Sequence, residues 1–307
     1  MDLDRQERNS DIKKATRTAF LFILFTMGVS QILGAVLPLP SDLCNCIGML
    51  LGTLVALRGP SGPEKGTLME DRQKMTGTRF VVLLGAFMAG KLLCLGPSAL
   101  LLQLFAAGKD PEALQSIVPA EGNLLTSFLF MGIVTPFCEE AVFRGCVGRT
   151  YKKYGIWFGL LMSSLLFAMY HGNLFQLVST FLPGVVLFYV AMNYGIKWSM
   201  LLHFINNGLL VSGKSLLDQF FPGAFLVNYG EYVLEAALIV AALLLMKKEN
   251  SVERVKDFLR APENEKGVYK AAMGNVWFVL MILFLLLMTA MVLAMMNGSL
   301  TAVPAAA

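Results

Sequence analysis

Apolar runs separated by short polar connections recur along almost the whole chain. Most of them approach the length that a helix needs to cross the hydrocarbon core of a bilayer, about 20 residues. They lie near residues 18–39, 43–57, 80–107, 123–148, 156–172, 174–195, 198–212, 224–246 and 276–296. Because the run at 43–57 is short, the pattern predicts an all-α, polytopic membrane helix bundle of eight or nine transmembrane helices.

The composition favours a membrane protein over a soluble domain. Hydrophobic residues make up 56% of the 307-residue chain, charged residues only 15%, and the mean hydropathy is +0.64. Soluble globular domains carry charge on roughly a quarter of their residues. The net charge of +4 is small, so no nucleic acid partner is indicated. We expect a multi-pass protein of the cell membrane, with the lipid bilayer as its surroundings.

The basic residues are distributed unevenly between the predicted connections. With the N-terminus in the cytoplasm, only Lys109 and Lys214 fall outside, Lys91 and Arg144 lie within spans, and the remaining 21 of the 25 Lys and Arg residues are cytoplasmic. This distribution follows the positive-inside rule. A re-entrant segment at 43–57 would reverse the sidedness of everything after it. The charged N-terminus and the long run behind it indicate a retained signal-anchor helix rather than a cleaved signal peptide.

The polar residues divide the chain into three parts. Residues 1–122 hold a cytoplasmic segment and the first transmembrane helices, 123–212 form a core of helices that carry unusual polar side chains, and 213–307 hold the last transmembrane helices. A polar stretch at 247–275 interrupts the third part. We interpret it as a solvated cytoplasmic linker, the alternative being an amphipathic helix on an anionic leaflet.

Small residues near the second run suggest packing rather than chemistry. Gly48 and Gly52 match the small-xxx-small pattern of close helix contacts. The chain has five cysteines, an odd number that implies no disulfide framework. Cys44 and Cys46 are interpreted as packing residues at a helix start, with a metal or redox site as the alternative.

Three charged residues lie in the apolar run 123–148, where they need an explanation. A charged side chain near the middle of a bilayer costs roughly 2.5–3.5 kcal/mol on insertion scales. Glu140 and Arg144 are four residues apart, so on a helix they can form an ion pair. Glu139 is rotated from Glu140 by about 100° and has no local partner. One glutamate is therefore expected to be structural and the other available for chemistry.

The chain contains only two histidines, and both lie in apolar helices. Phe167 precedes His171 by four residues and Asn207 follows His203 by four, so each pair shares a helix face. Gly155 lies midway between Glu139 and His171, so a helical hairpin that turns there would bring these two residues to the same depth. Two acids, an arginine, two histidines and an asparagine at compatible depth indicate a functional site.

These residues resemble the motifs of a known family. Glu139-Glu140-Ala-Val-Phe-Arg144, Phe167-Ala-Met-Tyr-His171 and His203-Phe-Ile-Asn-Asn207 resemble the EExxxR, FxxxH and HxxxN motifs of the CAAX prenyl protease and bacteriocin-processing family, also called the ABI family of intramembrane proteases. All three motifs are intact and in order. The resemblance covers roughly residues 123–212.

The resemblance implies a glutamate-type endopeptidase with its active site inside the bundle and no metal or other cofactor. Glu139 would deprotonate water, His171 would position it, and His203 with Asn207 would stabilise the oxyanion. The chemistry is consistent with this division, because an oxyanion needs hydrogen-bond donors and a base needs a carboxylate held ionised. Glu140 with Arg144 would orient the base, and Phe167 would shape the water pocket. The implied partner is a membrane-associated peptide or lipidated protein substrate.

Three other functions compete with this one. A zinc hydrolase could use a glutamate and the two histidines as ligands, although the sequence has no HExxH helix. A membrane scaffold or bacteriocin self-immunity protein could keep the fold without catalysis, yet no motif residue is lost. A transporter would show broken helices in repeated halves, and the sequence shows no such symmetry. The natural substrate, its cleavage site and its prenylation are not specified by the sequence.

Overall fold

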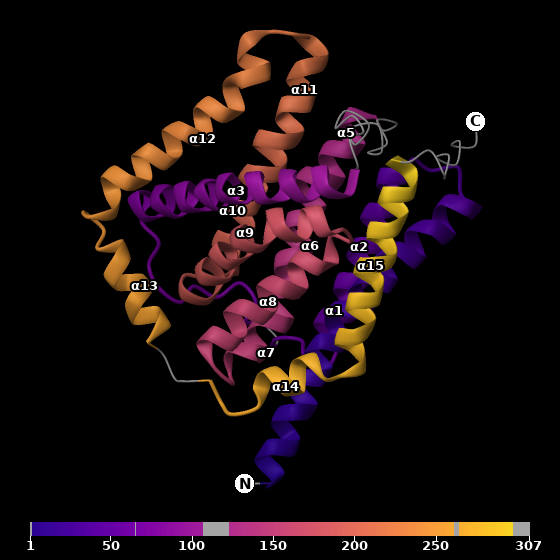
Figure 1. The fold of residues 1–307 in the computed structure, drawn as a ribbon, viewed down its shortest axis with the longest axis vertical. Helices are drawn as coiled ribbons and strands as arrows, with labels where there is room; N and C mark the ends of the chain where they lie inside the picture. The colour runs from indigo at the N-terminus through magenta and orange to yellow at the C-terminus, as the bar shows by residue number, and fades with distance from the viewer. Residues whose placement is uncertain (1, 65, 107–122, 261–263, 297–307) are drawn as a thin grey trace.

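Helices form the whole of the ordered architecture (Figure 1). The computed structural model describes residues 2–64, 66–106, 123–260 and 264–296, and no strand occurs among them. The predicted boundary at residue 122, Lys109 and the end of the chain lie outside the described residues. The elements are α1 (Asp2–Val36), α2 (Ser41–Arg58), α3 (Gly77–Ala106), α5 (Leu124–Ser127), η1 (Phe128–Val134), α6 (Thr135–Glu139), η2 (Glu140–Gly148), α7 (Arg149–Lys152), α8 (Ile156–Tyr170), α9 (Leu174–Asn193), α10 (Ile196–Phe204), η3 (Ile205–Ser212), α11 (Gly213–Phe220), α12 (Phe225–Met246), α13 (Ser251–Leu259), α14 (Val268–Met273) and α15 (Val276–Met296). The η elements are π-helical segments within longer helices.

Seven helices of the described chain are long and apolar enough to cross a membrane, which confirms the predicted polytopic bundle. They are Asp4–Val36, Ser41–Arg58, Gly77–Phe105, Leu124–Lys152, Leu174–Asn193, Phe225–Met246 and Val276–Met296. The other two predicted spans are also helical. The predicted span 156–172 becomes the shorter α8, which has 15 residues. The span 198–212 becomes α10 and η3, which continue into the polar α11.

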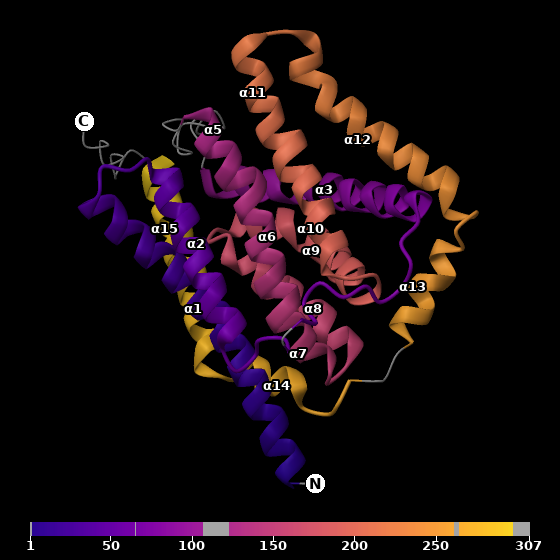
Figure 2. The same cartoon turned by 180° about the vertical axis from the view of Figure 1, so that it is seen from behind.

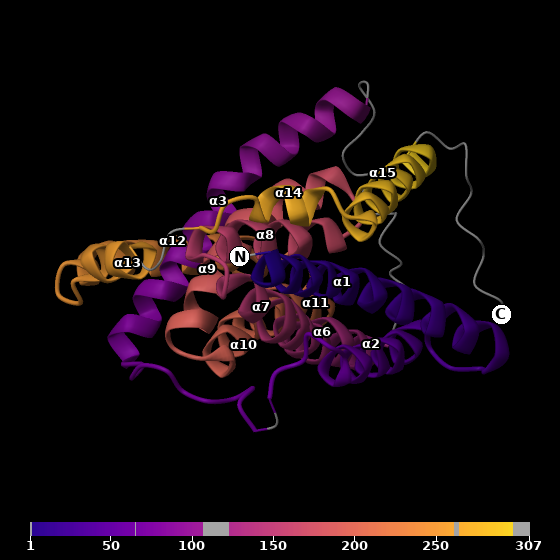
Figure 3. The ribbon, with the colours of Figure 1, turned by 90° about the horizontal axis from the view of Figure 1, so that it is seen from below.

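The helices that carry the predicted site lie between two outer groups. In Figures 1 and 2, α1, α2 and α15 lie together on one side of the molecule, and α12 and α13 lie on the other. Seen from below, α7, α8, α9 and α10 occupy the space between these groups (Figure 3). This central position keeps the polar side chains of these helices away from lipid. Charged side chains within a membrane are tolerated in the interior of a helix bundle.

The contact between α1 and α2 depends on the predicted pair of glycines. A Cβ atom on Gly48 would lie 2.5 Å from Ser30 Oγ, and one on Gly52 would lie 3.2 Å from the ring of Phe22. Side chains at these positions would therefore separate the two helices. Without strong hydrophobic attraction between helices in lipid, close backbone approach through small residues supplies the packing energy.

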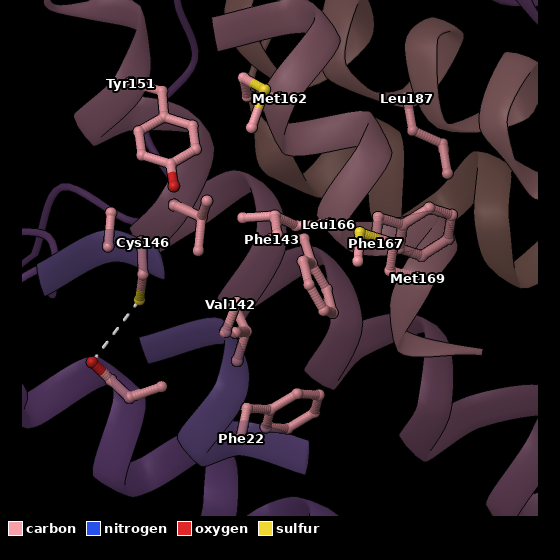
Figure 4. Packing of buried hydrophobic residues seen from close by; sticks show 14 of the residues in the cluster. Phe22, Val142, Phe143, Cys146, Tyr151, Met162, Leu166, Phe167, Met169 and Leu187 are labelled. Carbon is pink, nitrogen blue, oxygen red and sulfur yellow. Dashed lines mark hydrogen bonds between the residues drawn. The ribbon is translucent and has the colours of Figure 1, made fainter. Parts of the chain in front are cut away.

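Aromatic packing joins α1 to the centre of the bundle. The ring of Phe143, on η2, lies 6.0 Å from that of Phe22, on α1, and 5.6 Å from that of Phe167, on α8 (Figure 4). Both contacts have the edge-to-face geometry that aromatic rings prefer. Phe143 is fully buried, so it fixes η2 between its two neighbours.

The polar stretch 247–275, which was interpreted as a solvated linker, contains short helices. These are α13 and α14, which form because each short helix finds an apolar partner within the protein. The ring of Phe258, on α13, lies edge-to-face at 4.9 Å from that of Tyr189. Val268 and Ala272, on α14, are buried where α14 packs against α1.

The loops that were predicted to be cytoplasmic contact one another. Arg8 donates a hydrogen bond to the carbonyl of Lys266 (2.9 Å), and Arg149 donates one to the carbonyl of Leu68 (2.9 Å). Further hydrogen bonds in this layer of contacting loops join Tyr154 to Asp11, Lys197 to Asp71 and Arg79 to Glu249. Segments far apart in the sequence thus gather on one side of the protein, as the distribution of basic residues requires.

We predict that this layer faces the cytoplasm. The five cysteines are free and buried, so a cysteine introduced at the exposed Lys153 gives a clean signal. Lys153→Cys should react with an impermeant maleimide only after the membrane is opened, because the positive-inside rule places it inside. Gln219→Cys is the matched control, because Gln219 lies in α11, on the opposite side of the protein (Figure 1). It should be labelled in intact cells. Labelling of Lys153→Cys from outside would contradict the topology.

Candidate active site

A helical hairpin brings two of the predicted motifs together. The chain turns at Gly155, which has a φ of 139°, a conformation that favours glycine. The helix that ends with α7 then packs antiparallel against α8. The predicted turn at this glycine is therefore confirmed.

The expected ion pair between Glu140 and Arg144 is present and fully buried. Arg144 Nη1 lies 3.0 Å from Glu140 Oε1, and both side chains are 0% exposed. Arg144 Nη2 also donates to the carbonyl of Gly184, on α9, at 3.1 Å. Its guanidinium carbon lies 4.1 Å from the centre of the Phe167 ring. A cation that is paired, hydrogen-bonded and stacked on an aromatic face is stable in a buried position.

Gly184 makes room for this arrangement. A Cβ atom on Gly184 would lie 3.1 Å from the Phe167 ring and 3.5 Å from Arg144 Nη2. The guanidinium therefore fits between α9 and the Phe167 ring because residue 184 has no side chain. Sequence reasoning did not identify this position, since a glycine in an apolar helix carries no chemical signal.

His203 lies between the two glutamates. Its Nδ1 is 3.2 Å from Glu140 Oε1, and its Nε2 is 3.8 Å from Glu139 Oε2. A carboxylate paired with arginine accepts hydrogen bonds, so Nδ1 of His203 carries the proton of this contact. The sequence placed His203 with Asn207, whereas the structure places it against the glutamates of another helix.

Glu139 is a buried acid with one oxygen that has no hydrogen-bond partner in the part of the chain that the structure describes. It is 2% exposed, and its Oε2 has no hydrogen-bond partner among the described residues. Glu140 Oε2 and Arg144 Nε are also buried without a hydrogen-bond partner there. Leaving such groups unpaired costs about 1–3 kcal/mol each, more when they are charged. These three atoms are therefore candidates for contacts with water or substrate.

Phe167 links the two histidines. His171 follows the last residue of α8, and its Nδ1 lies 2.9 Å from the carbonyl oxygen of Phe167. A carbonyl only accepts, so Nδ1 carries the proton and Nε2 is left as an acceptor. The rings of His171 and His203 lie 5.0 Å and 5.9 Å from the Phe167 ring. No hydrogen bond or ion pair within the described chain joins His171 to Glu139.

Asn207 is held by its neighbour. Asn206 Nδ2 donates to Asn207 Oδ1 at 2.7 Å, which leaves the amide protons of Asn207 to be donated elsewhere. The described residues show no contact between Asn207 and the glutamates or histidines. Asn206 was missed in the sequence, where the doubled asparagine in an apolar run was the available signal.

The site lies where α-helical and π-helical hydrogen bonding alternate. Glu139 is the last residue of α6, and Glu140 begins the π-helical η2. Asn207 lies in the π-helical η3, whereas His203 lies in α10. A π-helix uses i→i+5 hydrogen bonds and commonly marks functional sites. Both glutamates lie at this transition, and both come close to His203, Glu140 at 3.2 Å and Glu139 at 3.8 Å.

Two glycines bring the glutamate helix and the His203 helix into contact. Gly132, on η1, and Gly208, on η3, lie at their crossing, where a Cβ atom on Gly132 would be 2.9 Å from Gly208 Cα. Real Cβ atoms essentially never approach this closely. The crossing thus sets the separation of the segments that carry the site.

Fold and site together define a multi-pass membrane protein with a buried Glu–Arg–His cluster among its central helices. Residues 121–209 match the family described as "Type II CAAX prenyl endopeptidase Rce1-like". This segment, which carries the three motifs, is similar to that family of membrane endopeptidases, and the match confirms the resemblance drawn from the motifs. The rest of the chain is not covered by the match. Searches of curated proteins and of solved structures found no match.

We predict that Gly132→Ala destabilises the protein by about 1–3 kcal/mol, the usual cost of overpacking. The added methyl group would meet backbone rather than a side chain that can move aside. Gly28→Ala is the matched control, since Gly28 is exposed on α1 and a Cβ atom there would have nothing within 4 Å. Thermal unfolding in one detergent should separate the two variants. Equal stability of the two would show that the crossing tolerates a larger residue.

Proposed function

We propose that the protein is an intramembrane peptide hydrolase in which Glu139 activates water. The observation that carries this proposal is the state of Glu139. It is 2% exposed, its Oε2 has no protein hydrogen-bond partner in the described chain, and it lies 3.8 Å from His203 Nε2. The neighbouring Glu140 is occupied by Arg144. Glu139 is thus the carboxylate that is free to take a proton.

The reaction requires one proton to move twice. Glu139 takes a proton from water as the water oxygen forms a bond to the carbonyl carbon of the peptide. The resulting tetrahedral intermediate carries negative charge on the former carbonyl oxygen. When the carbon–nitrogen bond breaks, Glu139 returns the proton to the departing amine. A single carboxylate thus serves as base and then as acid.

His203 and Asn207 supply the donors for the oxyanion in this proposal. Glu140 holds Nδ1 of His203, so Nε2 is the ring atom that faces Glu139. In its doubly protonated form the ring can donate from Nε2 to the oxyanion. The hydrogen bond from Asn206 to Asn207 Oδ1 leaves the Asn207 amide as a second donor. Donors fixed in advance stabilise the transition state without reorganisation.

His171 would position the water. The contact of its Nδ1 with the Phe167 carbonyl leaves an unprotonated Nε2, which can accept a hydrogen bond from water. His171 needs no direct contact with Glu139, because water can bridge them. Phe167 contacts both imidazole rings and the guanidinium of Arg144, so it shapes the pocket.

The proposed substrates are membrane-associated peptides or lipidated proteins. The burial of the site in central helices and the match to a CAAX prenyl endopeptidase family support this class. Mass spectrometry of peptides released from a membrane substrate library, with Glu139→Gln as control, would identify them. A non-enzymatic scaffold or immunity protein of the same fold predicts identical peptides in both samples.

We predict that the site works without a metal ion. The donor set supports this, since Glu140 and His203 already bind each other and Arg144 adds a positive charge beside them. In addition, no group of three His, Cys, Asp or Glu side chains in the described chain is placed to hold an ion. Active protein should contain no stoichiometric zinc, and a chelator should leave its rate unchanged. Loss of activity that zinc restores would favour the zinc hydrolase.

We predict that Glu139→Gln abolishes cleavage but leaves the protein folded. Glutamine has nearly the same shape as glutamate but cannot take a proton from water. Within the described residues Glu139 Oε2 has no hydrogen-bond partner, so the variant loses little packing. His171→Ala should remove most of the rate as well, and the double variant should be no worse, because both residues act in one step. Near-normal cleavage by folded Glu139→Gln would contradict the mechanism.

A second set of variants separates catalysis from stability. Glu140→Gln and Arg144→Ala should cost about 3–5 kcal/mol of stability, because each leaves the other charge buried and unpaired. His203→Ala and Asn207→Ala remove oxyanion donors, each worth about 10²- to 10³-fold in turnover. Asn207→Ala should keep normal stability. Unfolding and turnover are measured on the same purified variants. A loss of rate caused by unfolding can then be distinguished from a loss of catalysis in a folded protein.

A further inference from the structure

A polar cavity lies between the loop after α2 and the chain that runs from η2 through α7 into the turn after it. Its volume is about 420 Å³, within the range of sites for small molecules, roughly 300–1,000 Å³. It is lined by Ser61, Gly62, Pro63, Glu64, Thr67, Arg72, Gly145, Arg149, Thr150, Lys152, Lys153 and Met192. None of the proposed catalytic residues belongs to this lining.

The charge of the lining is strongly one-sided. Arg72, Arg149, Lys152 and Lys153 line the cavity with one carboxylate, that of Glu64, and Glu70 outside the lining lies close enough to act on the charge of Arg149. None of these four cations takes part in an ion pair within the described chain. Like charges held this closely repel one another, so an anion bound between them would be strongly attracted.

Hydrogen bonds to the rest of the fold hold the side chains of Arg149 and Lys152 and the backbone of Arg72. Arg149 donates to the carbonyls of Thr67 and Leu68 at 2.9 Å each. These hydrogen bonds hold the loop after α2 against α7. The backbone N–H of Arg72 donates to the carbonyl of Tyr194 at 3.2 Å. Lys152 Nζ donates to the carbonyl of Met192 at 3.4 Å. The side chains of Arg149 and Lys152 are therefore held beside the cavity before any ligand arrives, while those of Arg72 and Lys153 are exposed at its edge.

We propose that this cavity binds a phosphate-bearing headgroup. The cavity lies in the layer of contacting loops that the charge distribution assigns to the cytoplasmic side, where basic pockets between helices bind phosphorylated lipid headgroups. Arginine pairs with phosphate in a two-pronged geometry, and lysine adds a compact charge. The volume exceeds that of one phosphate, so a phosphorylated sugar ring of a lipid or a soluble sugar phosphate fits the same chemistry.

The test compares two variants that lose the same charge. Arg72→Gln/Lys153→Gln removes two exposed cations from the lining, while Lys13→Gln/Lys74→Gln removes two exposed cations of the same side from outside it. The full chain in phosphatidylcholine nanodiscs is titrated with dioctanoyl phosphatidylinositol 4-phosphate by calorimetry. We expect the first variant to bind about thirtyfold more weakly, since each basic residue near an anionic headgroup contributes about fivefold, and the control to bind within threefold of the unaltered chain.

Further arms identify the source of the phosphate. Inositol 1,4-bisphosphate and inorganic phosphate are titrated under the same conditions, and unfolding curves of both variants show that each is folded. Tight binding of the lipid with weak binding of the soluble compounds would assign a lipid headgroup. Equal binding of the soluble sugar phosphate would assign a soluble ligand to the same site. Absence of binding to the unaltered chain, or equal loss in both variants, would overturn the proposal.

Discussion

The burial of one guanidinium group governs the centre of this protein. Arg144 is fully removed from solvent, and three helices supply what its charge requires: the carboxylate of Glu140 on η2, the carbonyl of Gly184 on α9 and the ring of Phe167 on α8. A buried charge without such partners would cost several kcal/mol. The helices can pack only in the arrangement that satisfies it, and that arrangement also places Glu140 against His203. The contacts that allow Arg144 to be buried thus also set the geometry of the site.

Sequence reasoning identified much of this because charges and histidines in apolar helices are conspicuous. The ion pair of Glu140 with Arg144, the hairpin at Gly155 and the glycine contact of α2 all follow from spacing that local geometry dictates. The positions of Glu139 and His203 could not be derived in the same way. They depend on where α-helical hydrogen bonding gives way to π-helical bonding, and no residue type announces that change. Gly132, Gly184 and Gly208 were missed because their contribution is the absence of a side chain, which is meaningful only once the opposing surface is known.

The helices in the polar stretch 247–275 could not be predicted for a different reason. Its composition resembles that of a solvated linker, and isolated short helices are marginal in water. The helix α13 persists because Phe258 packs against Tyr189, a residue far away in the sequence. Similarly, α14 is anchored where its apolar residues meet α1. Tertiary contacts therefore override the local preference, and such contacts connect the end of the chain to both its beginning and its centre.

Because α- and π-helical segments alternate, the number of residues in each helix affects the arrangement around the site. In η2 and η3 the backbone accommodates residues in wider turns than an α-helix has, and His203 and Asn207 lie on either side of such a transition. Removing one apolar residue from the part of η3 after Asn207 would let the segment revert to α-helical turns and rotate α11 and α12 relative to the site, although every motif would keep its spacing. Two chains with identical motifs can therefore differ in how the last helices surround the polar groups. Insertions and deletions in these helices carry as much information about the site as substitutions do.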